Sequence, residues 1–398
     1  MPRYSLRVLV CALMCLLLSH QAPADTVPLY KNQMAPGPVA DAVLAGAEAL
    51  QKGDLTHAEA SLRHALQLKP DEPHALALLA QIEMRKGRPA EAQSYLQTAV
   101  SKNPKSAAAE EAMGRYLAVQ RKDAAAEAAL QKSVELDPKW ADARISLGDF
   151  YLSRDRTKEA LATYREAMAV DLNNASAHYS MAKALEATGD DRSAETELRA
   201  SAQLMPQSPL PHFALGDLLS RTGRLDTAIS EYEAAAKLDP KSGAPYVLVA
   251  MVQQKRGRPD LAEHAYRTAI SIQPDQVVAL NNLAWIDLRN PQKLDEALSF
   301  AQKSVRSAPN AGPYLDTLGW VYHVRGDNAQ AISNLKKATV ASPQDPEIHY
   351  HLAVAYEDSE KLADALAEMN KSLALKKDFP EAADARKRDE DLLKRVHQ

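Results

Sequence analysis

A spacing of 34 residues runs through almost the whole chain. Ten alanines mark it, and successive copies are 34 residues apart except for one step of 35: Ala58, Ala92, Ala126, Ala160, Ala194, Ala228, Ala262, Ala297, Ala331 and Ala365. A small residue lies 12 positions before most of these alanines and another lies seven positions after each, and eight copies have proline five positions further on. Such regularity requires one structural unit, copied ten times and stacked.

Each unit predicts two helices joined by a turn. In the sixth copy, Leu215 and Leu219 recur at helical spacing, Gly223 interrupts the pattern, and Ala228 and Tyr232 resume it. Aromatic residues make up only 5% of the 398 residues, and the apolar content relies on alanine and leucine, which favours helix over sheet. The repeated small residues allow the two helices to approach closely, and the proline ends the second helix.

The repeated residues resemble the tetratricopeptide repeat (TPR) family, whose unit has small residues at positions 8, 20 and 27 and proline at position 32. The resemblance covers residues 39–379, which hold the ten units. It implies an all-α fold, an α-solenoid wound as a right-handed superhelix of about ten helical hairpins. Residues 380–398 are expected to form a charged C-terminal capping helix, and residues 25–38 a short extended lead-in.

Residues 1–24 have the features of a secretory signal peptide. Arg3 and Arg7 precede an apolar run over residues 8–18, and small residues up to Ala24 mark a cleavage site. Eleven apolar residues are well short of the roughly 20 that a spanning helix needs, so no transmembrane span is expected after cleavage. Neither cysteine lies in a lipoprotein pattern. The sequence therefore predicts a periplasmic or secreted protein.

The residue inventory argues against an enzyme. The only cysteines are Cys11 and Cys15, so the predicted mature chain has no disulfide, no thiol nucleophile and no cysteine ligand for zinc. Most glycines occupy packing or turn positions, and none forms a phosphate-binding loop. His349 and His351 are two apart on a helix and point in divergent directions, which disfavours a metal pair. The net charge of −4 disfavours binding to nucleic acid. We therefore predict no catalytic residue, cofactor or metal.

Repeat positions 5, 9 and 12 share one helix face, which in the TPR family lines the concave groove. In the middle and late units these positions hold several aromatic and polar side chains. We take eight of them as candidate partner-binding residues: Tyr179, Phe213, Asn281, Trp285, Asp316, Trp320, His323 and Tyr350. Trp285 and Trp320 occupy equivalent positions in adjacent units. They either anchor a partner or pack neighbouring helices together, and position alone leaves both interpretations open.

The resemblance implies a scaffold that binds protein or peptide partners along this groove. Residues 281–353 also resemble TPR proteins of exopolysaccharide export or surface-protein sorting, which predicts a role in a cell-envelope, export or exopolysaccharide assembly machine. The alternative is a periplasmic chaperone or accessory subunit that presents peptide clients to a maturation enzyme. A shared solenoid does not decide between them.

Overall fold

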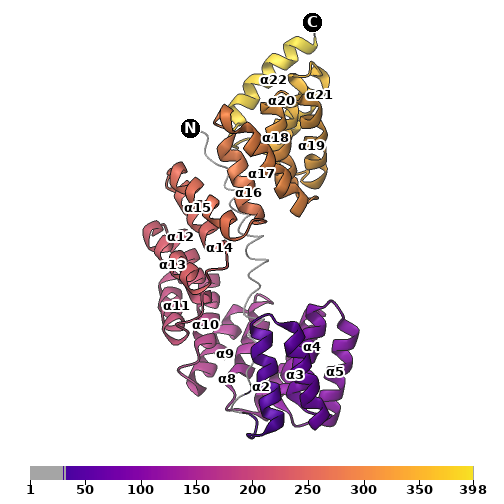
Figure 1. Ribbon diagram of the computed structural model, residues 1–398, viewed down its shortest axis with the longest axis vertical. Coiled ribbons are helices and arrows are strands. Elements are labelled where there is room, and N and C mark those ends of the chain that lie inside the picture. The colour runs from indigo at the N-terminus through magenta and orange to yellow at the C-terminus, as the bar shows by residue number, and fades with distance from the viewer. Residues whose placement is uncertain (1–29, 31–32, 398) are drawn as a thin grey trace. The chain divides into compact units, whose positions relative to one another are not determined.

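A computed structural model describes Tyr30 and residues 33–397 of the chain. The predicted signal peptide, residues 1–24, lies outside these residues. Over the described part the chain is helical, with α-helices α2 to α22, one short 3-10 helix and no strand (Figure 1). It divides into two compact units at residue 211. We call residues 30–211 the early unit and residues 212–397 the late unit.

The early unit contains five helical hairpins. Their helices, in chain order and two to a hairpin, are α2 (Pro38–Gln51) and α3 (Leu55–Leu68), α4 (Pro73–Arg85) and α5 (Pro89–Lys102), α6 (Ala107–Val119) and α7 (Asp123–Leu136), α8 (Ala141–Leu152) and α9 (Thr157–Val170), and α10 (Ala175–Thr188) and α11 (Asp191–Leu204).

The late unit repeats this arrangement five times and ends with a single helix. Its helices are α12 (Leu210–Arg221) and α13 (Leu225–Leu238), α14 (Ala244–Lys255) and α15 (Pro259–Ile272), α16 (Val277–Asp287) and α17 (Leu294–Ser307), α18 (Gly312–Val324) and α19 (Asn328–Ala341), α20 (Pro346–Glu357) and α21 (Leu362–Leu375), and α22 (Ala382–Val396). The 3-10 helix η2 (Pro291–Lys293) coincides with the one 35-residue step of the repeat.

Local sequence sets where these helices begin and end. The side chain of Asp54 accepts a hydrogen bond from the backbone N–H of His57 and caps α3, and Asp327 caps α19 in the same way. The second helix of a hairpin stops shortly before the repeated proline, as α13 does before Pro240. The helices α9 and α21 end at the same position of the repeat although their units have Leu172 and Lys377 in place of the proline, so its role as a helix terminator stays a prediction.

The small repeated residues hold each hairpin together. All ten repeated alanines are completely buried. A Cβ added to Gly46 would lie 2.6 Å from Cγ of Leu62, and one added to Gly148 would lie 2.4 Å from Cε1 of Tyr164. Both distances are too short for a real side chain, so the predicted close approach of the paired helices is confirmed.

In nine of the ten hairpins the turn has a left-handed backbone at one position, and in the remaining one, between α16 and α17, the turn contains η2 instead. Glycine provides it in most units, for example Gly53 with φ of 75°. Arg121, Asp155 and Glu360 take the same conformation, with φ of 57°, 58° and 58°, in three units that lack this glycine.

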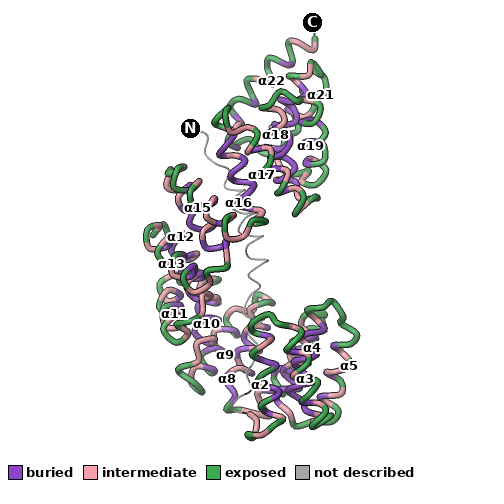
Figure 2. Tube along the Cα trace, viewed as in Figure 1, coloured by how far each residue is buried: buried purple, intermediate pink, exposed green. Residues whose placement is uncertain are grey.

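The first helix of each hairpin is the inner one. Figure 2 shows buried residues concentrated along helices such as α4, while the second helices have long exposed faces. After the tenth hairpin, α22 packs on α21 and buries Ala382, Ala385 and Leu392. The predicted fold class, an all-α solenoid of ten hairpins followed by one further helix, is therefore confirmed. Among the described helices, none combines the length and the apolar character needed to span a membrane.

Candidate functional site

The predicted partner-binding residues lie on the inner helices, on the face formed by positions 5, 9 and 12. We call this face the groove face. In the late unit, four rings on the groove face of α16, α18 and α20 and one further ring, from position 6 of α20, form a group that we call the late aromatic cluster: Trp285, Trp320, His323, Tyr350 and His351. Four of these five residues were predicted from the sequence, and the fifth, His351, was not.

His351 is the centre of the late aromatic cluster. Its ring centroid lies 4.3 Å from that of Trp320, 5.7 Å from that of Trp285 and 5.7 Å from that of Tyr350. The other neighbour of Trp320 is the stacked ring of His323, at 4.5 Å. The indole N–H of Trp285 donates a hydrogen bond of 2.6 Å to Thr317. Three successive hairpins are therefore joined by ring contacts and one hydrogen bond.

These contacts bear on the two interpretations of the tryptophans. Trp285 and Trp320 both pack against neighbouring helices, as the packing interpretation expects. Both also stay partly exposed, as does His323, so each ring keeps surface that another molecule could contact. Binding of a partner at these residues stays a prediction.

The other predicted residues are more deeply placed. Tyr350 is buried and donates a hydrogen bond of 2.7 Å to Asp384 of α22, and Asp316 is buried with its Oδ1 atom 2.8 Å from Nδ1 of His351. Asn281 is buried as well, and its side-chain oxygen has no hydrogen-bond partner within the described chain. Tyr179 on α10 and Phe213 on α12 are each only 7% exposed, so they offer little surface.

Position 6 of the repeat explains why His351 lies at the centre. A side chain at this position reaches back to the groove face of the preceding hairpin. His351 does so toward Asp316, Thr317 toward Trp285, and Ser146 toward Glu111, whose Oε1 atom lies 2.6 Å from the Ser146 hydroxyl. The opposite charges of Asp316 and His351, 35 residues apart, were the sequence signal for this pairing.

The late aromatic cluster lies in an acidic setting. Burial, and then repulsion from Glu381 and Asp345, raises the pKa of Glu347 to about 7. Burial also lowers the pKa of His351, but the carboxylate of Asp316 outweighs it and the net pKa is raised. Burial lowers the pKa of His323. No group of three or more potential metal ligands occurs in the part of the chain that the structure describes.

The early unit places an unexpected residue in its core. Tyr30, from the predicted lead-in, is only 5% exposed, and its ring lies edge-on to His74 with centroids 4.6 Å apart. The indole of Trp140 is 5.9 Å away. No sequence pattern predicts this contact, because Tyr30 precedes the repeats and belongs to no periodic pattern.

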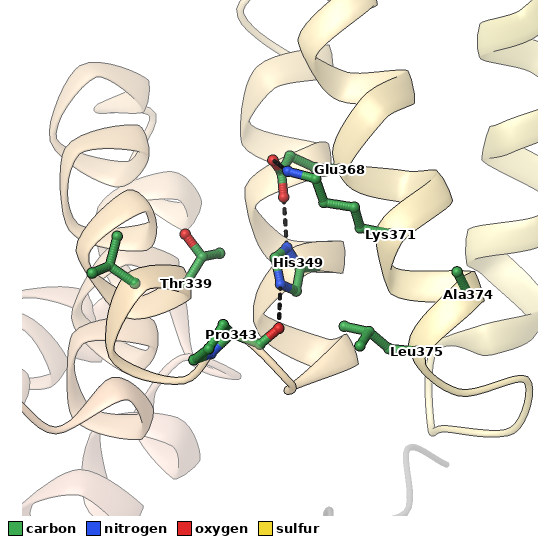
Figure 3. A pocket seen from close by; sticks show the side chains of 8 residues that line it. Thr339, Pro343, His349, Glu368, Lys371, Ala374 and Leu375 are labelled. Carbon is green, nitrogen blue, oxygen red and sulfur yellow. Dashed lines mark hydrogen bonds and ion pairs between the residues drawn. The ribbon is translucent and has the colours of Figure 1, made fainter.

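A pocket of another kind lies on the outer side of the last hairpins. Figure 3 shows it between α19, α20 and α21, with His349 and Glu368 among its lining residues. His349 Nδ1 lies 2.6 Å from Glu368 Oε2, and its Nε2 lies 3.1 Å from the carbonyl oxygen of Pro343. The hydrogen bond to Glu368 raises the pKa of His349.

The same histidine–glutamate contact occurs in two other hairpins, so it is a recurring structural contact of the repeat. His178 Nδ1 lies 2.5 Å from Glu197 and its Nε2 lies 3.0 Å from the carbonyl oxygen of Leu172, and His212 Nδ1 lies 2.7 Å from Glu231. All three histidines occupy position 4. Each of these histidines therefore links the first helix of its hairpin to the second helix.

Comparison with known proteins agrees with this architecture. Family models described as tetratricopeptide repeat match residues 49–116, 211–242 and 250–312, and one described as TPR repeat matches residues 148–189 and 319–360, together more than half of the chain. No curated protein sequence matches the chain significantly.

Several solved structures are similar. Yeast Tom70 is 16% identical, with 98% of this chain and 96% of that chain covered and a TM-score of 0.47. Cut9 in the APC/C hetero-tetramer Cut9–Hcn1 is 14% identical, with 90% and 97% covered and a TM-score of 0.47. Pseudomonas aeruginosa PilF is 18% identical, with 56% and 98% covered and a TM-score of 0.46. With its ten hairpins and the family matches along them, this chain belongs to the tetratricopeptide repeat family.

Proposed function

We propose that the protein is a non-catalytic scaffold that binds protein partners on its groove face. The observation that carries this proposal is the late aromatic cluster, which leaves parts of Trp285, Trp320 and His323 exposed on one face of α16 and α18. Large aromatic side chains of this kind dominate the binding energy of many protein interfaces.

The exposed rings are also held in place before any partner arrives. The hydrogen bond to Thr317 fixes the indole of Trp285, and the rings of His323 and His351 lie against Trp320. A side chain that is already ordered loses little conformational entropy on binding, so its contact area is converted more fully into affinity.

We further propose that the protein acts outside the cytoplasm, as a component of a cell-envelope, export or exopolysaccharide assembly machine. The support is the predicted signal peptide, the absence of cysteine after residue 15, and the resemblance of residues 281–353 to proteins of such systems. If the protein instead presents short peptide clients to a maturation enzyme, a bound client would cover only a few neighbouring hairpins.

The proposal is tested by capturing envelope proteins on the immobilised mature chain and comparing variants. We expect Trp320→Ala to reduce capture of the bound partner at least tenfold, and Trp320→Phe to retain most of it. Val340→Ala is the matched control, because Val340 on α19 is 81% exposed and lies on the outer helix of the same hairpin. It removes apolar surface without touching the groove face.

A photo-crosslinking residue at position 323 or 340 then identifies the face that the partner touches. We expect crosslinks from position 323 and few from position 340. Capture that Trp320→Ala leaves unchanged would contradict the proposal. A Trp320→Ala protein with a strongly lowered melting temperature would assign this residue to packing alone.

A further inference from the structure

We propose that the outer edge of the last three hairpins is a docking surface for an anionic lipid bilayer. The surface is formed by the second halves of α17, α19 and α21 and by the residues that follow α21. It lies on the outer helices, whereas the late aromatic cluster lies on the inner ones, so it does not depend on the function proposed for that cluster. We call it the basic band, after six exposed basic residues: Lys303, Arg306, Lys337, Lys371, Lys376 and Lys377.

The first step is the charge of this edge compared with the rest of the chain. Each hairpin has an outer stretch that runs from four to fourteen residues after its repeated alanine. In the first seven hairpins these stretches hold eleven basic and nine acidic residues. In the last three they hold seven basic residues and two acidic ones, Asp345 and Asp378, and Asp345 caps α20. A chain with a net charge of −4 therefore has one local edge of the opposite sign.

The second step is that these cations are not neutralised within the protein. Lys371 lies 2.7 Å from Glu368, but the other five residues of the basic band make no ion pair with any carboxylate of the described chain. The seventh basic residue, Lys336, has its ammonium 5.9 Å from the ring centroid of Tyr356 on the inner helix α20, so we leave it out of the band. Five uncompensated charges on one edge attract an external anion.

The third step places the charges on one face. Val340 of α19 and Lys371 of α21 line the same pocket, which lies between these two helices (Figure 3). They lie nine and six residues after the repeated alanine of their units. One hairpin earlier, Arg306 of α17 and Lys337 of α19 hold the same two positions. Because the hairpins repeat, this pair lies at the equivalent place between α17 and α19, and the basic band continues from one hairpin to the next.

The fourth step is the apolar side chain within the basic band. Val340 is 81% exposed, the highest value among the large apolar side chains of the described chain. Leu375 and Ala374 line the pocket beside it (Figure 3). Cations that surround a projecting aliphatic side chain suit the surface of a bilayer, where the cations contact anionic headgroups and the aliphatic group enters the boundary with the acyl chains.

The composition of the basic band favours a lipid surface over an acidic protein. Five of its six residues are lysines, which act as point charges on flexible stems, whereas recognition of a defined carboxylate favours the two-pronged geometry of arginine. Apart from Lys371, none of these side chains is held by a hydrogen bond within the described residues. A fluid layer of phosphate headgroups requires no such fixed geometry, since each lysine contributes through its charge near the surface.

The test measures sedimentation of the mature chain, beginning at Asp25, with vesicles made of equal parts of phosphatidylcholine and phosphatidylglycerol. We expect binding at about 0.1 M salt and little at about 1 M salt, because salt screens the attraction. Vesicles of phosphatidylcholine alone should bind little. A triple variant with Lys303→Gln, Lys337→Gln and Lys376→Gln should bind at least about 30-fold more weakly, since each lysine near an anionic surface contributes roughly fivefold. The same three residues changed to arginine should retain binding.

The matched control removes the same number of charges from the early unit. Lys102, Lys105 and Lys139 are exposed there, and none makes an ion pair with a carboxylate of the described chain. Their triple change to glutamine should leave vesicle binding close to that of the parent. The melting temperatures of both triple variants should match the parent, because each removed ammonium lies in solvent.

Three results would overturn the inference. One is an equal loss of binding in the two triple variants, which would assign the attraction to net charge and not to the basic band. Another is failure of the parent to bind the anionic vesicles at low salt. The third is binding of polyglutamate in place of the vesicles, which would assign the band to an acidic polypeptide. Trp320→Ala should leave vesicle binding unchanged, so this result and the test of the proposed function fail independently.

Discussion

The early and late units share one packing scheme but differ in where the aromatic rings beside their inner helices come from. In both units, a glycine of the first helix packs against a large side chain of the second helix, as Gly114 does against Leu130 and Gly319 against Leu335. A Cβ added to either glycine would lie 2.6 Å from Cγ of the leucine. The groove face of the late unit is covered by its own rings. The first two hairpins of the early unit have smaller groove residues, such as Ala47 and Ala77, and the ring in their core comes from Tyr30, outside the repeats.

This difference shows which positions of a repeat are free to change. The two helices of a hairpin cannot close unless the packing positions stay small, so these positions are alike in both units. The groove positions do not close a hairpin. They can therefore carry alanine in one unit and tryptophan in another, and they are where the two units acquire different binding properties.

The largest expected effect compares tryptophans of the two units. Trp140 is only 8% exposed and packs within the core of the early unit, so Trp140→Ala should lower the free energy of unfolding by about 3–5 kcal/mol. Trp320 is partly exposed, so Trp320→Ala should cost less than half as much. Urea unfolding followed by circular dichroism measures both, and equal losses would remove this contrast between the units.

A second prediction concerns acid sensitivity of the early unit. Burial of Glu72 raises its pKa, but hydrogen bonds from His74 and Lys69 outweigh that effect and lower the pKa to about 2. The unfolded chain binds this proton near pH 4.5, so the stability that Glu72 contributes is present above pH 4.5 and is lost as the pH falls toward 2. The Glu72→Gln protein should lose up to about 3 kcal/mol at pH 7 and little at pH 2.

In the late unit, Glu347 should make stability change with pH in the opposite direction. The pKa of Glu347 is raised to about 7, so the folded protein holds this proton between pH 4.5 and 7 while the unfolded chain releases it. Stability is therefore highest below pH 4.5 and falls as the pH rises to 7. Glu347→Gln should raise the melting temperature at pH 8 and leave it unchanged at pH 4. Calorimetric scans of the parent and both variants check the two signs, and parallel pH profiles would refute them.

A third prediction tests the packing that the units share. Gly114→Val and Gly319→Val each force a branched side chain against a buried leucine, and each should cost about 1–3 kcal/mol. We expect the two losses in unfolding free energy to be of similar size, because the added Cβ lies 2.6 Å from the Cγ atom of a leucine in both hairpins. A loss confined to one unit would show that the packing scheme differs between them.

The smallest expected effect compares two arginines at the same repeat position. Arg325 of the late unit pairs with the fully exposed Asp295, so Arg325→Ala should cost at most about 1 kcal/mol and nothing at high salt. Arg154 of the early unit is better buried and also bonds the carbonyl oxygen of Ala118 at 2.8 Å. Arg154→Ala should therefore cost more, and the excess should persist at 1 M salt. Unfolding at two salt concentrations distinguishes the two arginines.

The hairpins and their small packing residues could be predicted from the sequence, because each depends on residues within one unit. The hydrogen bonds of His178, His212 and His349 also lie within one unit, since each bonds a glutamate 19 residues later, but only the structure identified these partners. Contacts that depend on how hairpins stack were harder to predict. His351 is central because a side chain at position 6 contacts the preceding hairpin. Helical periodicity predicts the face on which a residue lies but not this contact between hairpins.

Tyr30 marks the limit of sequence-based prediction for this chain. It is one of 14 tyrosines, lies in a segment without periodicity, and is buried only because three hairpins form a recess that a single unit does not have. The burial of Tyr179, Phe213 and Asn281 could not be predicted either. The groove position of a residue determines the face on which it lies but not the neighbours that cover it.

Fluorine NMR of the protein labelled with 5-fluorotryptophan tests most directly the claim that the tryptophan of the early unit is covered by Tyr30 while those of the late unit stay partly exposed. The chain has three tryptophans, Trp140, Trp285 and Trp320, so three resonances report on the two units. With a soluble paramagnetic agent, we expect Trp285 and Trp320 to broaden in the parent protein while Trp140 stays sharp, and Trp140 to broaden once Tyr30→Ala uncovers it. Three equally broadened resonances in the parent, or a Trp140 resonance that Tyr30→Ala leaves unchanged, would contradict the account.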